Sequence, residues 1–347
     1  MFIRRAWYVA GLSSEVTDVP LGRQIIGEHV VFFRGKGGKP SALNAVCPHR
    51  GQNLALGRLV NGALQCSWHG WLWAGDGRCV AIPSQPKSKS IPDAIRAARY
   101  PLVERHGLLW IWMDPQGEPD SPEPHFDLLD VPGSRTRYEA PVLALGGWMN
   151  HIENTLNGAH LSFVHTRSMG PYLPTLVGEE AISYSKDMRG FQSSQSERAK
   201  AGKTTSELNI INAGPMKWCA GFVGISPVKN RTSHFSLPGV TIVHQEYENG
   251  TTESLLGAVT PANAELTWFI LGSVRTRGLS PLGDLLQRRF LKHLLAEDVG
   301  ICETPLTNGP FGHPKPISVG SDVKMLAFRK LYARALTEEN QSVPWPH

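Results

Sequence analysis

Two short segments, each pairing one cysteine with one histidine, constrain this chain more than any other feature of its sequence. Cys47 and His49 form the first pair, Cys66 and His69 form the second, and sixteen residues separate His49 from Cys66. Cysteine thiolates and histidine imidazoles are strong ligands for transition metals. The fold of this region is therefore expected to bring two tight loops to one metal centre.

Two kinds of metal centre use this ligand set. In a [2Fe–2S] cluster, Cys47 and Cys66 would bind one iron and His49 and His69 the other, and the imidazoles would raise the reduction potential. A structural zinc ion uses the same four residue types. Zinc modules usually pair cysteine with cysteine and histidine with histidine, whereas each loop here mixes the two. The mixed spacing favours the cluster.

The residues that follow each ligand pair, Arg50-Gly51 and Gly70-Trp71, complete a recognisable pattern. It resembles the Rieske domain of ring-hydroxylating non-haem iron oxygenases, including dicamba-, toluenesulfonate- and vanillate-type members. The resemblance implies an α+β chain in which an antiparallel β Rieske domain precedes a catalytic domain of the helix-grip type. In that arrangement a curved antiparallel sheet surrounds a long C-terminal helix.

The composition of the chain and the positions of its glycine-rich and proline-rich segments indicate two domains. The 347 residues are 41% hydrophobic and 19% charged, as in ordinary globular proteins. Short β-branched and aromatic runs between glycine-rich turns predict an all-β first third. Four prolines between Pro115 and Pro124 predict a linker. We expect a Rieske domain at 1–114, a linker at 115–138 and a catalytic domain at 139–347.

The expected second domain mixes helices and strands. A helix is expected around 148–163, a hairpin with Asn249-Gly250 at its tip, and a strand at 266–274. Ser280-Pro281 predicts the start of a helix that runs to Glu303, and a last helix is expected at 321–336.

Several function classes are not expected. No run of eighteen apolar residues predicts a membrane span, and no apolar segment near Met1 predicts a secretory signal. The net charge of +5 is spread out, without the basic and aromatic clusters typical of nucleic-acid binding. The five cysteines do not suggest a disulfide framework, so a reducing cytoplasm is the expected setting.

A second metal site is predicted from two histidines, His160 and His165. Five residues on a regular helix turn the chain by roughly 140° beyond a full circle, so the two would not share one helix face. They can converge if the helix loosens or ends between them, and Gly158 favours such a departure. Two histidines and one carboxylate form the facial triad that binds Fe(II) and leaves positions open for O₂.

Asp298 is the candidate carboxylate. It lies near the centre of an apolar stripe on the predicted helix 281–303, where an unpaired carboxylate is costly and a metal ion would justify it. An arginine or backbone amides could satisfy it instead. The stripe contains Phe290, Leu291, Leu294, Leu295, Val299 and Ile301. The opposite arc, expected to face solvent, contains Lys292, His293, Glu297 and Glu303.

The family resemblance extends to this second site, because the segment from Glu153 to His165 and the position of Asp298 match its iron-binding pattern. It implies an oxygenase component that uses O₂ and NAD(P)H-derived electrons to hydroxylate or O/N-demethylate a small aromatic or heterocyclic compound. A cis-dihydroxylating dioxygenase is the alternative within this class. The chain lacks a glycine-rich dinucleotide motif, so a separate flavin and iron–sulfur reductase or a ferredoxin is expected as partner. Similar proteins form homotrimers.

One position departs from the family pattern. Asn157 stands where the family carries an aspartate that bridges a cluster histidine of one subunit and an iron histidine of its neighbour. A carboxylate can accept hydrogen bonds from two imidazoles, whereas an amide presents one oxygen. Slower electron transfer than with aspartate is therefore expected.

Three further residues are candidates for the substrate pocket. Arg275 and His244 could line it, and Gly257 stands where dicamba-type members carry a substrate-binding histidine, so dicamba is not the expected substrate. Two other classes remain open: a Rieske electron carrier, which has no need of a second iron, and a zinc-stabilised binding module, which would be colourless.

Overall fold

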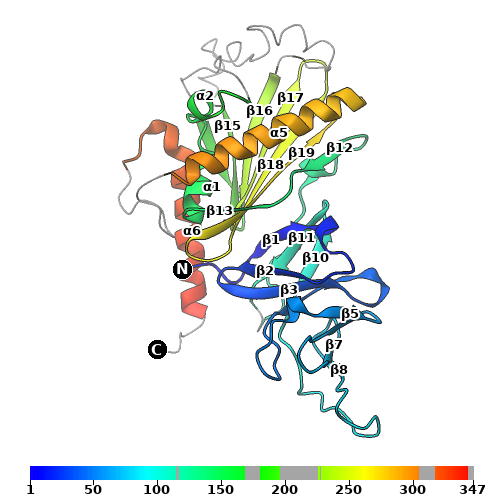
Figure 1. Ribbon diagram of the computed structural model, residues 1–347. Coiled ribbons are helices and arrows are strands. Elements are labelled where there is room, and N and C mark those ends of the chain that lie inside the picture. The colour runs from blue at the N-terminus through cyan, green and yellow to red at the C-terminus, as the bar shows by residue number, and fades with distance from the viewer. Residues whose placement is uncertain (115–116, 169–179, 196–225, 227, 305–316, 343–347) are drawn as a thin grey trace. The chain divides into compact units, whose positions relative to one another are not determined.

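The computed structural model describes residues 1–114, 117–168, 180–195, 226, 228–304 and 317–342. The chain divides into two compact units (Figure 1). One comprises Met1–His125 with Thr260–Asn263, and the other comprises Phe126–Val259 with Ala264–His347. Within the range expected to be a linker, residues 135–138 form a strand of the second unit.

The first unit consists of three antiparallel sheets with the orders β1-β11-β10, β2-β3-β4-β9 and β5-β6-β7-β8. Its elements are β1 Trp7–Leu12, η1 Ser13–Glu15, β2 Leu21–Ile25, β3 Glu28–Arg34, η2 Lys36–Gly38, β4 Pro40–Asn44, η3 Leu54–Leu56, β5 Arg58–Val60, β6 Ala63–Gln65, β7 Leu72–Trp73, β8 Cys79–Ala81, β9 Arg99–Tyr100, β10 Leu102–Arg105 and β11 Leu108–Trp112. Strand β11 is the central strand of its sheet and is buried along its whole length, as its continuous apolar run predicts.

The second unit is built on an eight-stranded antiparallel sheet with the order β12-β19-β18-β17-β16-β15-β14, in which β13 also pairs with β19. Its strands are β12 Arg135–Tyr138, β13 Val142–Leu145, β14 Glu180–Tyr184, β15 Gly190–Gln195, β16 Val228–Ser236, β17 Val240–Tyr247, β18 Thr252–Pro261 and β19 Leu266–Arg275. Gly250, with a φ of 79°, forms the turn between β17 and β18, as predicted from Asn249-Gly250.

Helices pack against this sheet. They are η4 Asp127–Leu129, α1 Trp148–Leu156, α2 Leu161–Val164, α5 Pro281–Cys302, η6 Gly320–Asp322 and α6 Val323–Ser342. The Ser280 hydroxyl accepts a hydrogen bond from Gly283 N at 3.1 Å, so the predicted cap does begin α5. Helix α5 crosses the central strands in Figure 1, which confirms the sheet and long helix expected for this unit. Among the described residues, none of the helices has the length and apolar character that crossing a bilayer requires.

The helical segment expected around 148–163 consists of two helices, α1 and α2, separated by residues 157–160, which include Gly158. The backbone at Asn157 is extended, with φ −82° and ψ 121°, and this conformation ends α1. The break determines where the candidate iron ligands point.

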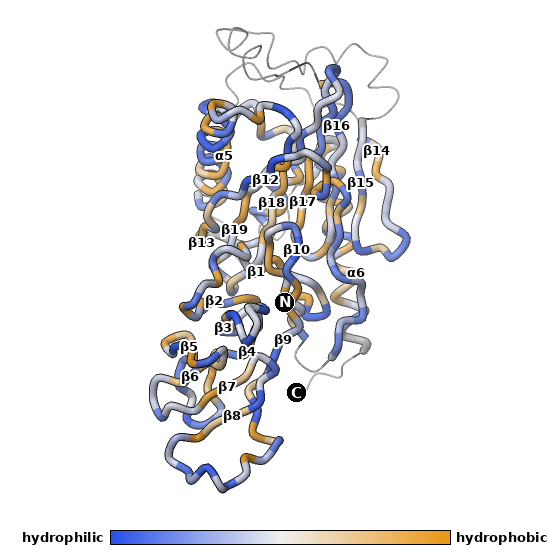
Figure 2. The backbone as a smooth tube through the Cα atoms, turned by 90° about the vertical axis from the view of Figure 1, so that its right-hand side faces the viewer, coloured by the Kyte–Doolittle hydropathy of each residue, from blue (hydrophilic) through white to orange (hydrophobic). Residues whose placement is uncertain are grey.

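Aromatic side chains hold α1 and α6 against the sheet. Phe328 of α6 has its ring centroid 5.3 Å from that of Phe235 on β16 and 6.0 Å from that of Trp148 on α1. Tyr332 lies 4.7 Å from Trp148. Figure 2 shows hydrophobic residues along the central strands β17 to β19, while hydrophobic and hydrophilic residues alternate along α5. One face of α5 is therefore buried on the sheet.

Candidate metal centres

The two cysteine and histidine loops of the first unit have the same backbone form. In each, the carbonyl of the cysteine accepts a hydrogen bond from the glycine four residues later, at 2.8 Å between Cys47 and Gly51 and at 3.1 Å between Cys66 and Gly70. Both glycines lie in the left-handed region, with φ of 78° and 71°. Other residues rarely adopt this conformation, which explains the glycine in each loop.

The four expected cluster ligands come together in an asymmetric arrangement. Cys47 and Cys66 are buried in an apolar core that includes Trp73, whereas His69 is exposed and His49 is partly exposed. The two imidazole rings have their centroids 4.6 Å apart. Burial raises the pKa of the Cys47 thiol, and the neighbouring Cys66 raises it further. Paired thiols inside and paired imidazoles outside fit a [2Fe–2S] cluster with two unlike irons.

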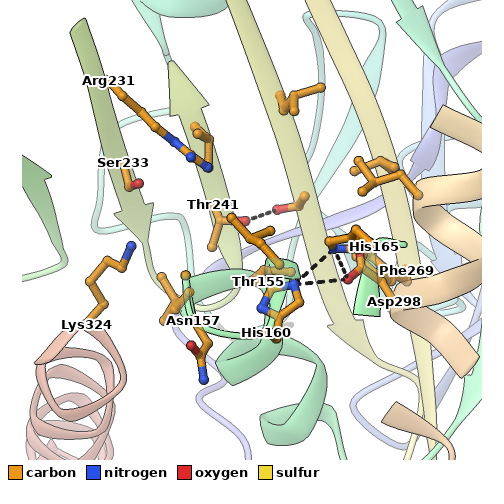
Figure 3. A pocket seen from close by; sticks show the side chains of 18 residues that line it. Thr155, Asn157, His160, His165, Arg231, Ser233, Thr241, Phe269, Asp298 and Lys324 are labelled. Carbon is orange, nitrogen blue, oxygen red and sulfur yellow. Dashed lines mark hydrogen bonds and ion pairs between the residues drawn. The ribbon is translucent and has the colours of Figure 1, made fainter. Parts of the chain in front are cut away.

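A second set of donors converges in the second unit. His160 Nε2 lies 3.0 Å from His165 Nε2 and 3.6 Å from Asp298 Oδ1, and His165 Nε2 lies 3.3 Å from the same oxygen (Figure 3). Donors that bind one ion at about 2.1 Å and at right angles are about 3 Å apart. The three side chains therefore fit a single metal ion.

The helix break produces this convergence. His160 precedes α2 and His165 follows it, so a single helical turn separates the two histidines. The first helix ends at Leu156, before His160 rather than between the two histidines. Asp298 reaches them from the buried face of α5, as its position on the apolar stripe predicted, although Ile301 of that stripe is 44% exposed.

Two further side chains orient these donors, and periodicity did not single them out. Asn154 Nδ2 donates a hydrogen bond to Asp298 Oδ1 at 2.7 Å. Glu297 was expected on the solvated arc of α5 but turns inward, where Oε2 lies 3.2 Å from His165 Nδ1. The backbone N–H of Arg167 and the hydroxyl of Ser168 also donate to this carboxylate. In the sequence, these roles are indicated only by position. Glu297 is adjacent to Asp298, and Asn154 lies three residues before Asn157.

The charges at this site favour an ionised Asp298. Burial alone would raise the pKa of Asp298, but hydrogen bonds and charge from His160 and His165 outweigh it, so the pKa is lowered. Burial likewise works against protonation of His165, yet Asp298 and Glu297 raise its pKa. A cation is therefore well accommodated among these groups.

A pocket opens beside the three donors. It is lined by alternate residues of four strands, which share one face of the sheet because side chains alternate along a strand. Helices α1, α2, α5 and α6 and the non-helical residues on either side of α2 contribute the rest of the lining. The apolar part includes Val243, Leu255, Phe269, Leu271 and Leu294.

Of the three residues considered for a substrate pocket, Gly257 lines this one. A Cβ at Gly257 would lie 2.9 Å from Thr241 Oγ1 and 3.4 Å from Thr155 Cγ2, so the pocket wall is closely packed around this glycine. Arg275 lies elsewhere, 2% exposed, and its guanidinium is engaged by Asp284 and by backbone carbonyls. His244 also lies outside the lining, with Nδ1 2.9 Å from Ser254 Oγ.

Asn157 lies in the break between α1 and α2 and lines the same pocket (Figure 3). Its Oδ1 accepts a hydrogen bond from Ala159 N at 2.7 Å, which uses the oxygen that a bridging role would need. The buried Nδ1 of His160 has no hydrogen-bond partner among the described residues.

Comparison with known proteins identifies the first unit. Residues 6–94 match the family model of the Rieske [2Fe-2S] domain. A putative toluene-4-sulfonate monooxygenase system iron-sulfur subunit, TsaM2 of Comamonas testosteroni, is 36% identical over 180 residues, which are 49% of this chain and 48% of that protein. The vanillate O-demethylase oxygenase subunit of Pseudomonas sp. is 35% identical over 182 residues, which are 49% of this chain and 47% of that protein. The matches thus span about half the length of these relatives.

The whole chain has a counterpart among solved structures. The crystal structure of dicamba monooxygenase bound to dicamba superposes with a TM-score of 0.77 and 23% identity, and the match covers 98% of this chain and 99% of the other. Such a likeness establishes the fold. This chain therefore contains a Rieske [2Fe–2S] domain and has the fold of dicamba monooxygenase, which confirms its resemblance to the Rieske non-haem iron oxygenases.

Proposed function

We propose that this chain is the oxygenase component of a Rieske-type system that hydroxylates or O/N-demethylates a small aromatic or heterocyclic compound with O₂. The observation that carries the proposal is the convergence of His160, His165 and Asp298 at a pocket, in a chain that also contains a Rieske domain. An electron carrier has no use for this second site.

Each metal has its own residues in the proposal. Two thiolates and two imidazoles hold the [2Fe–2S] cluster, and two imidazoles and a carboxylate hold Fe(II); the residues are Cys47, Cys66, His49 and His69 for the first, and His160, His165 and Asp298 for the second. The bound Fe(II) supplies O₂ activation beside the substrate, with electrons from the cluster.

The surrounding residues orient these ligands and hold the substrate. Glu297 accepts a hydrogen bond from His165 Nδ1–H and so directs Nε2 toward the metal. Asn154 restrains the Asp298 carboxylate. The apolar wall formed by Phe269, Leu271 and Leu294 excludes water and gives an aromatic ring a surface to lie against. Asn157 occupies the position from which the family connects its two metal centres.

The names of the relatives support a system of several proteins. TsaM2 and the vanillate protein are each named as one subunit of a larger enzyme, so a separate NAD(P)H-dependent reductase or ferredoxin is part of the proposal. A homotrimer and a cytoplasmic location complete it, with the Rieske domain preceding the catalytic domain. Monooxygenases and demethylases are named among the relatives, and so are dioxygenases. We propose mono-oxygenation as the reaction and keep cis-dihydroxylation as the alternative.

Iron content and product analysis test the proposal. The reconstituted protein is expected to hold about three irons per chain, two in the cluster and one at the second site, and to show the signal of a reduced Rieske cluster. Methoxy- and N-methyl-aromatics should release formaldehyde, or hydroxylated products should form, when a reductase, NAD(P)H and O₂ are supplied. About two irons and no O₂-dependent product would instead indicate an electron carrier, and a colourless zinc protein would contradict both. A cis-dihydrodiol product would replace the mono-oxygenase assignment.

A further inference from the structure

The pocket beside the three donors also carries two positively charged side chains. Arg231 extends from β16 and Lys324 from α6, and both line the pocket away from the donors (Figure 3). Neither was singled out by the sequence, because a lone basic residue on a strand or helix usually faces solvent.

The strand register places Arg231 on the pocket face. Arg231 and Ser233 lie two residues apart on β16. Ser233 pairs with Val243 of β17, which also lines the pocket. Since side chains two residues apart share one face of a strand, the guanidinium and the Ser233 hydroxyl lie on the same side as the apolar wall. A one-residue shift in register would be needed to turn Arg231 away.

The two positively charged side chains, Arg231 and Lys324, have one neighbouring carboxylate between them among the described residues. Lys324 Nζ forms an ion pair with Glu180 Oε1 at 2.9 Å. Within the part of the chain that the structure describes, no carboxylate oxygen lies within 4.0 Å of the Arg231 guanidinium. The second oxygen of Glu180 is buried and does not bond to Arg231 either. This end of the pocket therefore has an excess of one positive charge.

The excess charge is energetically significant because water is partly excluded. Burial lowers the pKa of Arg231 and that of Lys324, although Glu180 raises both, and the positive charge of Arg231 lowers the pKa of Lys324 further. A guanidinium stays protonated under such conditions. An anion placed between the two side chains would relieve both the desolvation and the mutual repulsion.

We propose that the substrate is an aromatic carboxylate whose carboxylate group is bound by Arg231, with Lys324 and the Ser233 hydroxyl beside it. A planar guanidinium matches a carboxylate with two parallel hydrogen bonds, which a lysine cannot provide. The ring then lies against Phe269 and Leu271, and its far end points toward the three donors. This inference rests on the proposed oxygenase function and narrows its substrate to anionic compounds.

Matched pairs of charged and neutral probes test the inference by binding. Isothermal titration of the reconstituted full-length protein would compare benzoate with benzamide, and 4-methoxybenzoate with 4-methoxybenzamide. Each carboxylate is expected to bind at least about 10-fold more tightly than its carboxamide. Adding 4-methoxybenzenesulfonate separates a planar anion from a tetrahedral one, and the carboxylate should bind more tightly.

Variants connect the preference to Arg231. Arg231→Met should weaken carboxylate binding by about 10- to 100-fold and leave carboxamide binding nearly unchanged. Arg231→Lys should restore part of the loss, whereas Arg288→Met, which removes an exposed charge on α5, should have no effect. The melting temperature and the cluster absorption of each variant show whether it is folded. If Arg231→Met does not fold, the inference is tested by the ratio of carboxylate to carboxamide affinity in the unaltered protein.

Two results would overturn the inference: carboxamides that bind as tightly as carboxylates, or no carboxylate binding that depends on Arg231. Product analysis runs separately. Carboxylate binding without any O₂-dependent product would support the anion site and contradict the oxygenase function. Turnover of neutral compounds alone would support the oxygenase function and contradict the anion site.

Discussion

The two candidate metal centres of this protein are assembled in contrasting ways. All ligands of the first lie within residues 47–69, in two loops with the same backbone hydrogen bonds. The second joins two histidines beside a one-turn helix to an aspartate more than a hundred residues later. The first centre is thus local in sequence, whereas the second exists only if α5 packs correctly against α1 and α2.

Burial differs between the two centres as well. The imidazoles of the first reach the surface, with His69 exposed, while His165 of the second is 1% exposed and held by Glu297. An electron-accepting group benefits from a short path to the surface, and a site for O₂ chemistry benefits from the exclusion of water. The contrast is consistent with the proposed function, in which one centre takes up electrons and the other uses them.

Removing one ligand from each centre should show the largest effect, because it separates the two. Asp298→Ala is expected to lower product formation by on the order of 1,000-fold and to reduce the iron content from about three to about two per chain, since the third donor is lost. The Rieske signal should persist. Cys66→Ser should abolish that signal. Glu248→Ala, at an exposed position of the same unit as Asp298, serves as control. If Asp298→Ala retained full iron, the two centres would not be separate in this way.

The outer carboxylate of the second centre offers a sharper test. Glu297→Ala is expected to weaken Fe(II) binding by about 10- to 100-fold, because His165 loses the partner that orients it. Iron titration of the protein with an intact cluster would measure this. Glu297→Gln keeps one acceptor oxygen, so its Fe(II) affinity should lie between those of Glu297→Ala and the unaltered protein. Equal Fe(II) affinity in all three proteins would show that Glu297 has no positioning role.

Glycine is expected to matter differently at two positions of the second unit. Gly257→Ala is expected to lower the free energy of unfolding by about 1–3 kcal/mol, because the new Cβ would meet Thr241 Oγ1 at 2.9 Å. Gly300→Ala, whose Cβ meets nothing within 4 Å on α5, should be neutral or stabilising. Chemical denaturation of both variants measures the difference. A Gly257→Ala protein as stable as the unaltered one would show that the pocket wall yields easily.

The smallest effect is expected at Asn157, from which the two centres are connected in the proposed function. Asn157→Asp should speed electron transfer from the cluster to the second site severalfold, because a carboxylate can accept a hydrogen bond from an imidazole while still capping Ala159 N. Single-turnover experiments with a pre-reduced cluster would measure the rate, with Asn157→Ala as the control. An unchanged rate in Asn157→Asp would refute the expectation.

Much of the fold followed from local patterns. The Ser280-Pro281 cap and the Asn249-Gly250 turn lie where they were expected, because each depends on the conformation of a few adjacent residues. The helical segment expected around 148–163 is divided by the extended backbone at Asn157, so the break precedes both histidines and does not lie between them. The last helix begins at Val323 and extends to Ser342, beyond its expected end.

The site residues also divide into those that local sequence patterns predicted and those that only the tertiary structure placed. The amino-acid sequence by itself determined the cysteine and histidine loops, because their ligands are neighbours in the chain and glycines set the turns. It also marked Asp298, since a carboxylate within an apolar stripe requires a partner. Only the tertiary structure turned Glu297 inward, engaged Arg275 with Asp284 and set Arg231 and Lys324 on one pocket. These outcomes depend on which distant strand or helix supplies the neighbouring charge, and no local pattern carries that information.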